Sequence, residues 1–134
     1  MDDITDFYAW TREQANALRR GASNEIDWDN LAEKIETVGR SERREVRSRL
    51  ALILRHLLKW QYQPERQSRD GRNTISTQRE DLSDVIADSP SLKAYQSEIL
   101  ADAYARGSPQ CAQRFQMPED CPWTIDQVGN NFLP

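Results

Sequence analysis

The apolar residues of this chain recur with the period of an α-helix almost everywhere, and strand-like alternation never persists for more than four residues. Glycine and proline interrupt the pattern at intervals, as expected for helices separated by short connections. The pattern predicts an all-α protein, a compact bundle of five to six helices. At 134 residues the chain has the length of one domain, so we expect residues 1–134 to form a single helical domain.

The first helix is expected to begin at Thr5 or Asp6 and to end at Arg20, closed by Gly21. Its apolar register is ambiguous, and the candidate inner face consists of Phe7, Trp10, Ala15 and Leu18. Asp27 is a good N-cap for a second helix. The apolar stripe of that helix is expected to face the core and consists of Trp28, Leu31, Ile35 and Val38.

A third helix is expected from a Ser41 cap to the break imposed by Pro64. It has the clearest apolar period and should be the central helix, with an inner face of Val46, Leu50, Ile53, Leu54, Leu57 and Leu58. Gly39 either separates the second and third helices or lies inside one long bent helix over residues 28–62. Glycine inside a helix costs only about 1 kcal/mol relative to alanine, so both alternatives remain open, and we favour a break.

The segment over residues 63–74 contains no strongly apolar residue and is either an exposed connection or the polar beginning of the next helix. A fourth helix is expected to end near Asp88, with an inner face of Ile75, Leu82, Val85 and Ile86. Ser89 and Pro90 form the N-cap and N1 pattern of a fifth helix. Its inward residues should be Leu92, Tyr95, Ile99 and Ala103.

Two features are expected near the end of the chain. Gly107 and Pro109 should kink or break the fifth helix. Thr124 should cap a short final helix, with Gln127 at the third helical position of a capping box.

The composition is polar, with 30% charged and 37% hydrophobic residues, but the regular return of large apolar residues favours folding over disorder. The N-terminal sequence MDDITDF lacks the basic start and apolar run of a secretory signal, and no stretch approaches a membrane span. We therefore expect a cytoplasmic protein with no membrane partner. Reduced thiols are favoured for Cys111 and Cys121, with a bridge between them as the alternative.

Charge is segregated along the sequence. Eleven Lys and Arg face four Asp and Glu between Arg40 and Arg79, a local charge of +7 in a chain of net charge -4. Complementary acidic flanks favour internal pairing of the arginines. The basic set includes Arg40, Arg43, Arg44, Arg47 and Arg55, and the expected acidic partners are Asp27, Asp29, Glu33, Glu36, Glu80, Asp81, Asp84 and Asp88.

The alternative is that this basic segment contacts phosphate or nucleic acid. The candidate residues are Arg66, Arg69, Arg72 and Arg79, with Trp60 and Tyr62 as stacking faces. An isoelectric point near 5.1 opposes nonspecific binding to a polyanion. The turn from Lys59 to Arg72 is nevertheless expected to be the surface richest in functional residues, because its aromatics and arginines exceed what a simple connection needs.

Catalytic chemistry has little support in the sequence. His56 is the only histidine, and no carboxylate or nucleophile accompanies it at helical spacing. Glu33 and Glu36 lie three residues apart, but a di-metal bundle needs further ligands that this chain lacks. An enzyme built on His56 with these two glutamates is therefore the weakest alternative, and we predict no catalytic residue, metal or cofactor.

The four tryptophans are Trp10, Trp28, Trp60 and Trp123, a high number for so polar a chain. Core anchoring is the default interpretation, because three of them lie on or beside predicted inward stripes. A tryptophan left on the surface would instead indicate a site for a partner.

Five segments together resemble a bacterial family known as domain of unknown function 29, abundant in cyanobacteria: DFYAWTREQANALR, DNLAEKIETVGRSERREVRSRL, HLLKWQYQPERQSR, SPSLKAY and DCPWTIDQV with FLP. The resemblance spans nearly the whole chain. It implies an all-helical cytoplasmic bacterial protein and transfers no catalytic residue. One departure is Gly71, where the resemblance leads us to expect a tryptophan, which weakens an anchoring role at that turn.

The function best supported by the sequence is a non-enzymatic protein-interaction module that contacts itself or a partner. A nucleic-acid-associated module using the segment from Arg40 to Arg79 is the first alternative.

Overall fold

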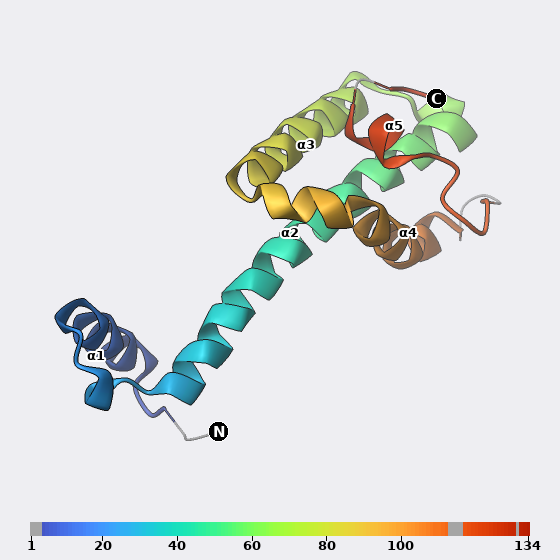
Figure 1. The fold of residues 1–134 in the computed structure, drawn as a ribbon. Coiled ribbons are helices and arrows are strands. Elements are labelled where there is room, and N and C mark those ends of the chain that lie inside the picture. The colour runs from blue at the N-terminus through green and yellow to red at the C-terminus, as the bar shows by residue number, and fades with distance from the viewer. Residues whose placement is uncertain (1–3, 113–116, 131) are drawn as a thin grey trace. The chain divides into compact units, whose positions relative to one another are not determined.

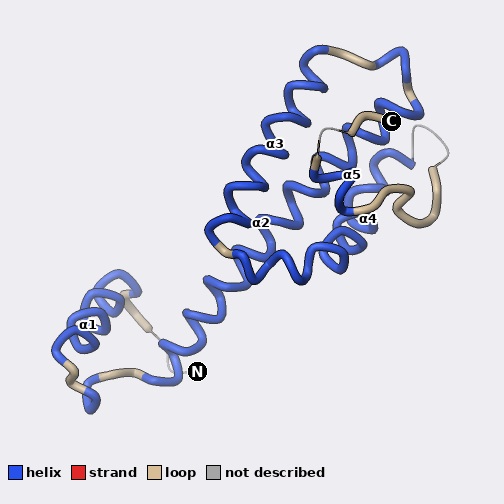
Figure 2. Tube along the Cα trace, turned by 45° about the horizontal axis from the view of Figure 1, so that its top comes forward, coloured by secondary structure: helices blue, strands red, loops and turns tan. Residues whose placement is uncertain are grey.

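The computed structural model describes residues 4–112, 117–130 and 132–134, apart from the side chains of Arg66 and residues 107–112. In this part of the chain every regular element is a helix and there is no strand, so the predicted all-α class is confirmed (Figure 2). The α-helices are α1 (Phe7–Arg20), α2 (Trp28–Tyr62), α3 (Arg69–Asp88), α4 (Gln96–Ala112) and α5 (Ile125–Gly129). Three 3₁₀ segments connect them: η1 (Ser23–Glu25), η2 (Pro64–Arg66) and η3 (Pro90–Tyr95).

The chain divides into two compact units, Met1–Ser41 and Glu42–Pro134. Their boundary lies inside α2, so both units contribute residues to the same helix. The single domain predicted over residues 1–134 stays a prediction.

The helix α2 continues without interruption through Gly39, so the expected break at this position is wrong. Gly39 has no left-handed backbone conformation, and a Cβ built on it would touch nothing within 4 Å. Ser41 does not act as a cap; its hydroxyl donates to the carbonyl of Thr37, 3.0 Å away. A single glycine costs about 1 kcal/mol, too little to end a helix that is favoured on both sides.

In the N-terminal unit the predicted limits of the first helix are confirmed. The Asp6 carboxylate accepts from the N–H of Ala9, and Gly21 closes α1 in the left-handed region at φ 67°. The expected inner face is wrong in part, because Phe7 and Leu18 are exposed. The buried residues are instead Gln14, Ala17 and Asn30.

Gln14 explains this polar interior. Its amide donates to the carbonyl of Glu25 and accepts from the N–H of Asp27, at 3.2 and 2.7 Å. Asp27 caps α2, receiving the side-chain and backbone N–H groups of Asn30. These bonds satisfy main-chain groups of the connection between α1 and α2. The inner face of α1 therefore presents the Gln14 amide to this connection and does not present an apolar stripe.

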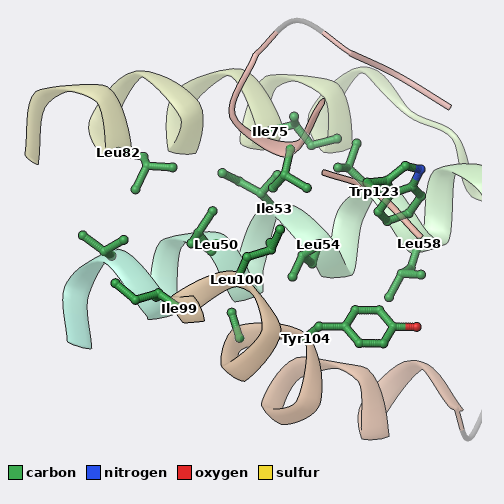
Figure 3. Close-up of a cluster of buried hydrophobic side chains, with 14 residues drawn as sticks. Leu50, Ile53, Leu54, Leu58, Ile75, Leu82, Ile99, Leu100, Tyr104 and Trp123 are labelled. Atoms are coloured by element: carbon green, nitrogen blue, oxygen red, sulfur yellow. The ribbon is translucent and has the colours of Figure 1, made fainter. Parts of the chain in front are cut away.

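The C-terminal unit contains the hydrophobic core. Here α3 and α4 flank α2 (Figure 1), and side chains from all three helices and from the C-terminal segment meet between them (Figure 3). The six predicted core residues of α2 are all at most 1% exposed. They pack with Ile75, Leu82, Ile99, Leu100, Ala103, Tyr104, Trp123 and Val128. Full burial of one such Leu or Ile contributes about 1.5–3 kcal/mol, so this unit has a substantial source of stability.

The connection between α2 and α3 combines both sequence alternatives for residues 63–74. Pro64 begins the 3₁₀ turn η2, and Ser68 then caps α3 by accepting from the N–H of Gly71 at 3.0 Å. The polar residues from Arg69 onward are therefore the first turns of the helix. The predicted end of this helix at Asp88 is confirmed.

The fifth predicted helix begins with the 3₁₀ segment η3 and continues as α4. Tyr95 is exposed rather than inward, because η3 has three residues per turn and rotates its last side chain out of the stripe. Of the kink or break expected at Gly107 and Pro109, the break is wrong, since α4 continues to Ala112, and the kink stays a prediction. A proline inside a helix removes one N–H donor and crowds the carbonyl four residues earlier, and a bend can accommodate both without ending the helix. The capping box of Thr124 and Gln127 on α5 is confirmed.

Candidate functional site

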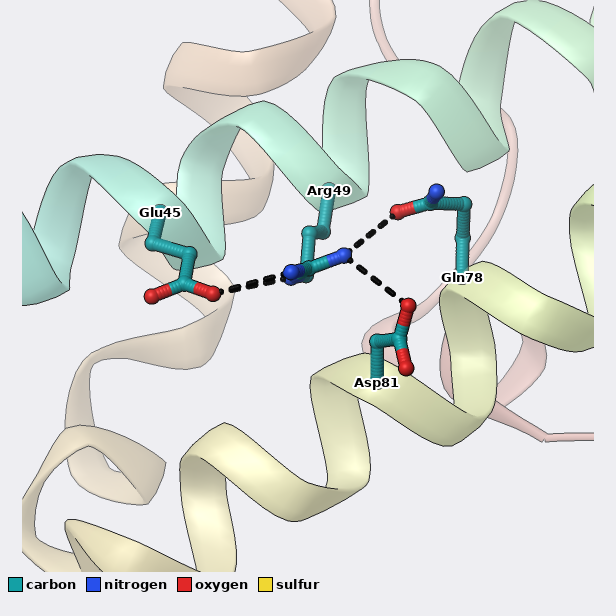
Figure 4. Close-up of polar contacts among 4 residues, drawn as sticks. All are labelled: Glu45, Arg49, Gln78 and Asp81. Carbon is teal, nitrogen blue, oxygen red and sulfur yellow. Dashed lines mark hydrogen bonds and ion pairs between the residues drawn. The ribbon is translucent and has the colours of Figure 1, made fainter.

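The arginines of α2 are largely paired within the molecule. Arg49 is the best connected: one nitrogen binds Gln78 and Asp81 on α3 at 3.0 and 3.2 Å, while the others bind Glu45 (Figure 4). Arg43 and Arg47 pair across to α4 rather than to the acidic residues expected from the sequence. Their partners are Glu98 at 3.6 Å and Asp102 at 3.4 Å.

Arg79 is also committed to the fold. Its guanidinium donates to three main-chain carbonyls near the C-terminus, those of Gln127, Val128 and Phe132, at 3.0, 2.8 and 2.7 Å. Two of these carbonyls belong to the last turn of α5, where no intrahelical donor remains. Arg79 therefore caps α5, and partial burial lowers the pKa of its guanidinium. This position leaves Arg79 little capacity for the external anion considered from the sequence.

The turn between α2 and α3 keeps several of the predicted site residues. The guanidinium of Arg72 lies over the ring of Trp60, 5.5 Å from its centroid. Tyr62 is half-buried against the core and has interactions of its own. Arg69 is exposed, and the side chain of Arg66 lies outside the described residues.

A cavity of about 440 Å³ opens at this turn and is lined by His56, Lys59, Trp60, Ser68, Asp70, Gly71 and Thr74. A Cβ at Gly71 would lie 3.2 Å from the Ser68 hydroxyl and 3.8 Å from His56 Nδ1. The absence of a side chain at this position therefore leaves space in the cavity between Ser68 and His56. Burial, reinforced by the charges of Lys59 and Arg55, lowers the pKa of His56. A neutral imidazole results at neutral pH.

Catalytic or metal chemistry gains no support from this arrangement. Within the described residues His56 has no hydrogen-bond partner that could orient it as a base. Glu33 and Glu36 belong to the N-terminal unit and His56 to the other. Across residues 4–112, 117–130 and 132–134, no three His, Cys, Asp or Glu side chains gather as metal ligands.

The tryptophans and cysteines fall into different surroundings. Trp123 is buried in the core, and Trp10 is half-buried and donates its indole N–H to Asp27. Cys121 carries a free thiol whose pKa is raised by burial. The side chain of Cys111 lies outside the described residues. Trp28 is the tryptophan left on the surface.

The apolar face of the N-terminal unit is the most unusual surface in the described structure. It consists of Trp28, Leu31, Ile35 and Val38 on α2, the stripe that the sequence assigns to a core. Leu31 is half-buried, but Trp28, Ile35 and Val38 are 60, 65 and 66% exposed. At about 100° per residue the four side chains fall within an arc of about 80°. The expected inward orientation is wrong, because α1 contacts the neighbouring edge of α2 instead.

That neighbouring edge is formed by Asp27, Asn30 and Lys34. Trp10 donates to Asp27 at 3.2 Å, Asn30 is buried, and the Lys34 ammonium lies 5.3 Å from the centroid of the Phe7 ring. These polar contacts hold α1 beside the apolar face without covering it. Periodicity cannot reveal this outcome, because an uncovered stripe and a buried one have the same spacing in the sequence.

The family described as Domain of unknown function DUF29 matches residues 4–133. The chain belongs to this family. The match covers both units, so the apolar face and the α2–α3 turn are both parts of the DUF29 region.

Neither the curated proteins nor the solved structures include a match to this DUF29 chain. In the part of the chain that the structure describes, no helix has both the length and the apolar character needed to cross a membrane.

Proposed function

We propose that this DUF29 protein is a protein-interaction module and that the apolar face of α2 (Trp28, Leu31, Ile35 and Val38) is its binding surface. The observation that carries the proposal is the exposure of three large apolar side chains on one face of one helix. Exposed apolar side chains are ordinary when scattered, but a contiguous set marks a site for a partner.

The composition of the N-terminal unit supports this interpretation. Its buried residues within the described chain are Gln14, Ala17 and Asn30, two of which are polar. Trp28, Ile35 and Val38 are therefore available to a partner instead of forming a core. Tryptophan is also enriched among the residues that dominate binding energy at interfaces.

The three exposed apolar side chains supply only part of the free energy that a specific contact needs. Full burial of one large apolar side chain contributes about 1.5–3 kcal/mol. Trp28, Ile35 and Val38 are 60–66% exposed, so covering what remains of all three supplies about 3–6 kcal/mol before the cost of association. That cost is at least about 4 kcal/mol, so the contact needs further polar or apolar interactions to reach micromolar affinity.

The function is tested by site-specific photo-crosslinking in the native host. A crosslinking amino acid at Ile35 should give a discrete adduct. The same group at Glu33, which lies on the opposite side of α2, should not. Adding Trp28→Ser and Val38→Ser should remove the adduct formed from position 35. Equal crosslinking from both positions, or none from position 35, would refute the proposal.

The turn with Trp60 and Arg72 remains a proposal for a second contact surface, together with Tyr62, Arg66 and Arg69. Replacing Arg66, Arg69 and Arg72 with serine separates the alternatives. Lost partner binding at an unchanged melting temperature supports a contact surface, whereas a large drop in melting temperature assigns these charges to the fold.

A further inference from the structure

The apolar face has an acidic border on one side. Each of its residues is followed by a residue of a second row, one position further along α2: Asp29, Ala32, Glu36 and Gly39. This acidic row alternates a carboxylate with a small residue. The two rows share the spacing i, i+3, i+7 and i+10, so they run side by side along the helix.

The carboxylates of the acidic row are exposed and at most weakly paired. Asp29 makes no ion pair within the described residues. Glu36 has only a 3.9 Å contact with Arg40, in which both side chains are well exposed. Ala32 and Gly39 have a methyl group and no side chain, respectively, so little projects from the helix beside the carboxylates. The space around Gly39 is open, because a Cβ built there would meet nothing within 4 Å. Another helix can therefore approach the backbone of α2 closely along this row.

From this arrangement we propose that the apolar face binds an amphipathic helix of another protein whose apolar stripe is bordered by lysine or arginine. This inference rests on the proposed function and names the class of its partner. The partner's apolar side chains cover Trp28, Ile35 and Val38, while its cations reach Asp29 and Glu36. The N-terminal unit has nine Asp and Glu against five Lys and Arg over residues 1–41, so its net charge also attracts a basic segment.

A second copy of the chain fits this face poorly. In an antiparallel two-fold pair the same edge of each helix meets, which brings the two acidic rows together. In a parallel pair the acidic row meets the edge of Asp27 and Lys34, which α1 already contacts. The basic segment of a second copy is no substitute, because its apolar stripe is buried in the C-terminal core and Arg43, Arg47 and Arg49 are paired.

The experiment uses the full chain and two synthetic helical peptides of about 20 residues that carry the same leucine stripe. Lysine borders the stripe in one peptide and glutamate borders it in the other. Binding is measured by anisotropy of a peptide label, with the fluorescence of the protein's tryptophans as a second signal. We expect the lysine-bordered peptide to bind at least about tenfold more tightly, corresponding to about 1.4 kcal/mol.

Three variants make the test specific. Asp29→Lys with Glu36→Lys should abolish or reverse the preference between the peptides. The matched control Glu33→Lys, on the opposite side of α2, should retain it. The double variant Trp28→Ser with Ile35→Ser should bind neither peptide, while its circular dichroism shows the same helix content as the wild type.

The inference is overturned if the wild-type chain binds the two peptides equally, or binds neither at about 100 μM, near the weak limit of specific association. It is also overturned if sedimentation shows a dimer of the chain that Trp28→Ser with Ile35→Ser disrupts. A crosslink from position 35 together with failed peptide binding refutes only the basic helix. Absence of that crosslink refutes the proposed function itself.

Discussion

Arg79 gives the sharpest test of how the C-terminal segment is held in place. We expect Arg79→Met to destabilise the C-terminal unit by about 3 kcal/mol. The variant keeps an apolar stem of similar length but removes the donors to the carbonyls of Gln127, Val128 and Phe132. Each hydrogen bond from a charged group contributes about 1.5–3 kcal/mol, and we use less than the full sum because water can solvate part of the exposed carbonyls.

Arg79→Lys should recover part of this loss, since an ammonium group is a compact donor that cannot span three separated carbonyls in one plane. The matched control is Arg69→Met on the same helix. The Arg69 side chain is exposed and makes no hydrogen bond or ion pair within the described residues, so its replacement should change stability by less than about 0.5 kcal/mol.

The assay is urea unfolding followed by circular dichroism and by tryptophan fluorescence. With a slope of about 1–3 kcal/mol/M, a loss of about 3 kcal/mol lowers the midpoint by about 1–3 M. Trp123 lies in the core just before α5, and its fluorescence should change in the same transition. If Arg79→Met and Arg69→Met have equal midpoints, the three hydrogen bonds do not stabilise the fold and the reasoning is refuted.

Three further predictions concern other parts of the structure. The pKa of His56 in the folded protein lies below the ordinary value of 6.5, so the free energy of unfolding is at its full value above pH 6.5 and declines as the pH falls below it. Urea midpoints measured one pH unit above and one pH unit below 6.5 should differ less in His56→Gln than in the wild type, and an unchanged difference contradicts the lowered pKa. Gly39→Ala should raise the free energy of unfolding by about 0.5–1 kcal/mol, because the added methyl meets nothing and lowers the cost of the helix; a decrease would show strain at this position. A double-mutant cycle with Arg49→Met and Asp81→Asn should give a coupling of about 0.5–1 kcal/mol that shrinks in high salt, and a coupling of zero would remove this pair from the helix contacts.

The sequence predicted those elements whose local signals and tertiary contacts agree. The core residues of α2 from Val46 to Leu58 combine a clear apolar period with neighbours that pack against them, and the Gly21 termination and the Thr124 capping box depend only on local bonds. The break expected at Gly39 is absent because a helix ends only where its flanking segments do not favour helix, and a single residue does not determine that.

The candidate sites were harder to predict, because exposure and pairing depend on which element lies opposite. Trp28 and Ile35 have the spacing of core residues. The polar contacts of Gln14 with the α1–α2 connection, and those of α1 with Asp27 and Lys34, explain why α1 leaves them uncovered. Arg79 lies in a basic run in the sequence, yet its partners are main-chain carbonyls about 50 residues later, which composition cannot reveal.

The continuity of α2 also has a consequence for the order of folding. Starting a helix is costly, with a nucleation constant of about 10⁻³, whereas extending an existing helix is nearly free. The apolar half of α2 is buried in the C-terminal core, so that unit supplies the nucleus, and residues 28–41 can grow from it toward the N-terminus without a core of their own. The end of the helix that carries the proposed binding surface is then the last part to form and the first to fray. A ligand on Trp28 and Ile35 would therefore be detected as slower amide exchange along the first turns of α2.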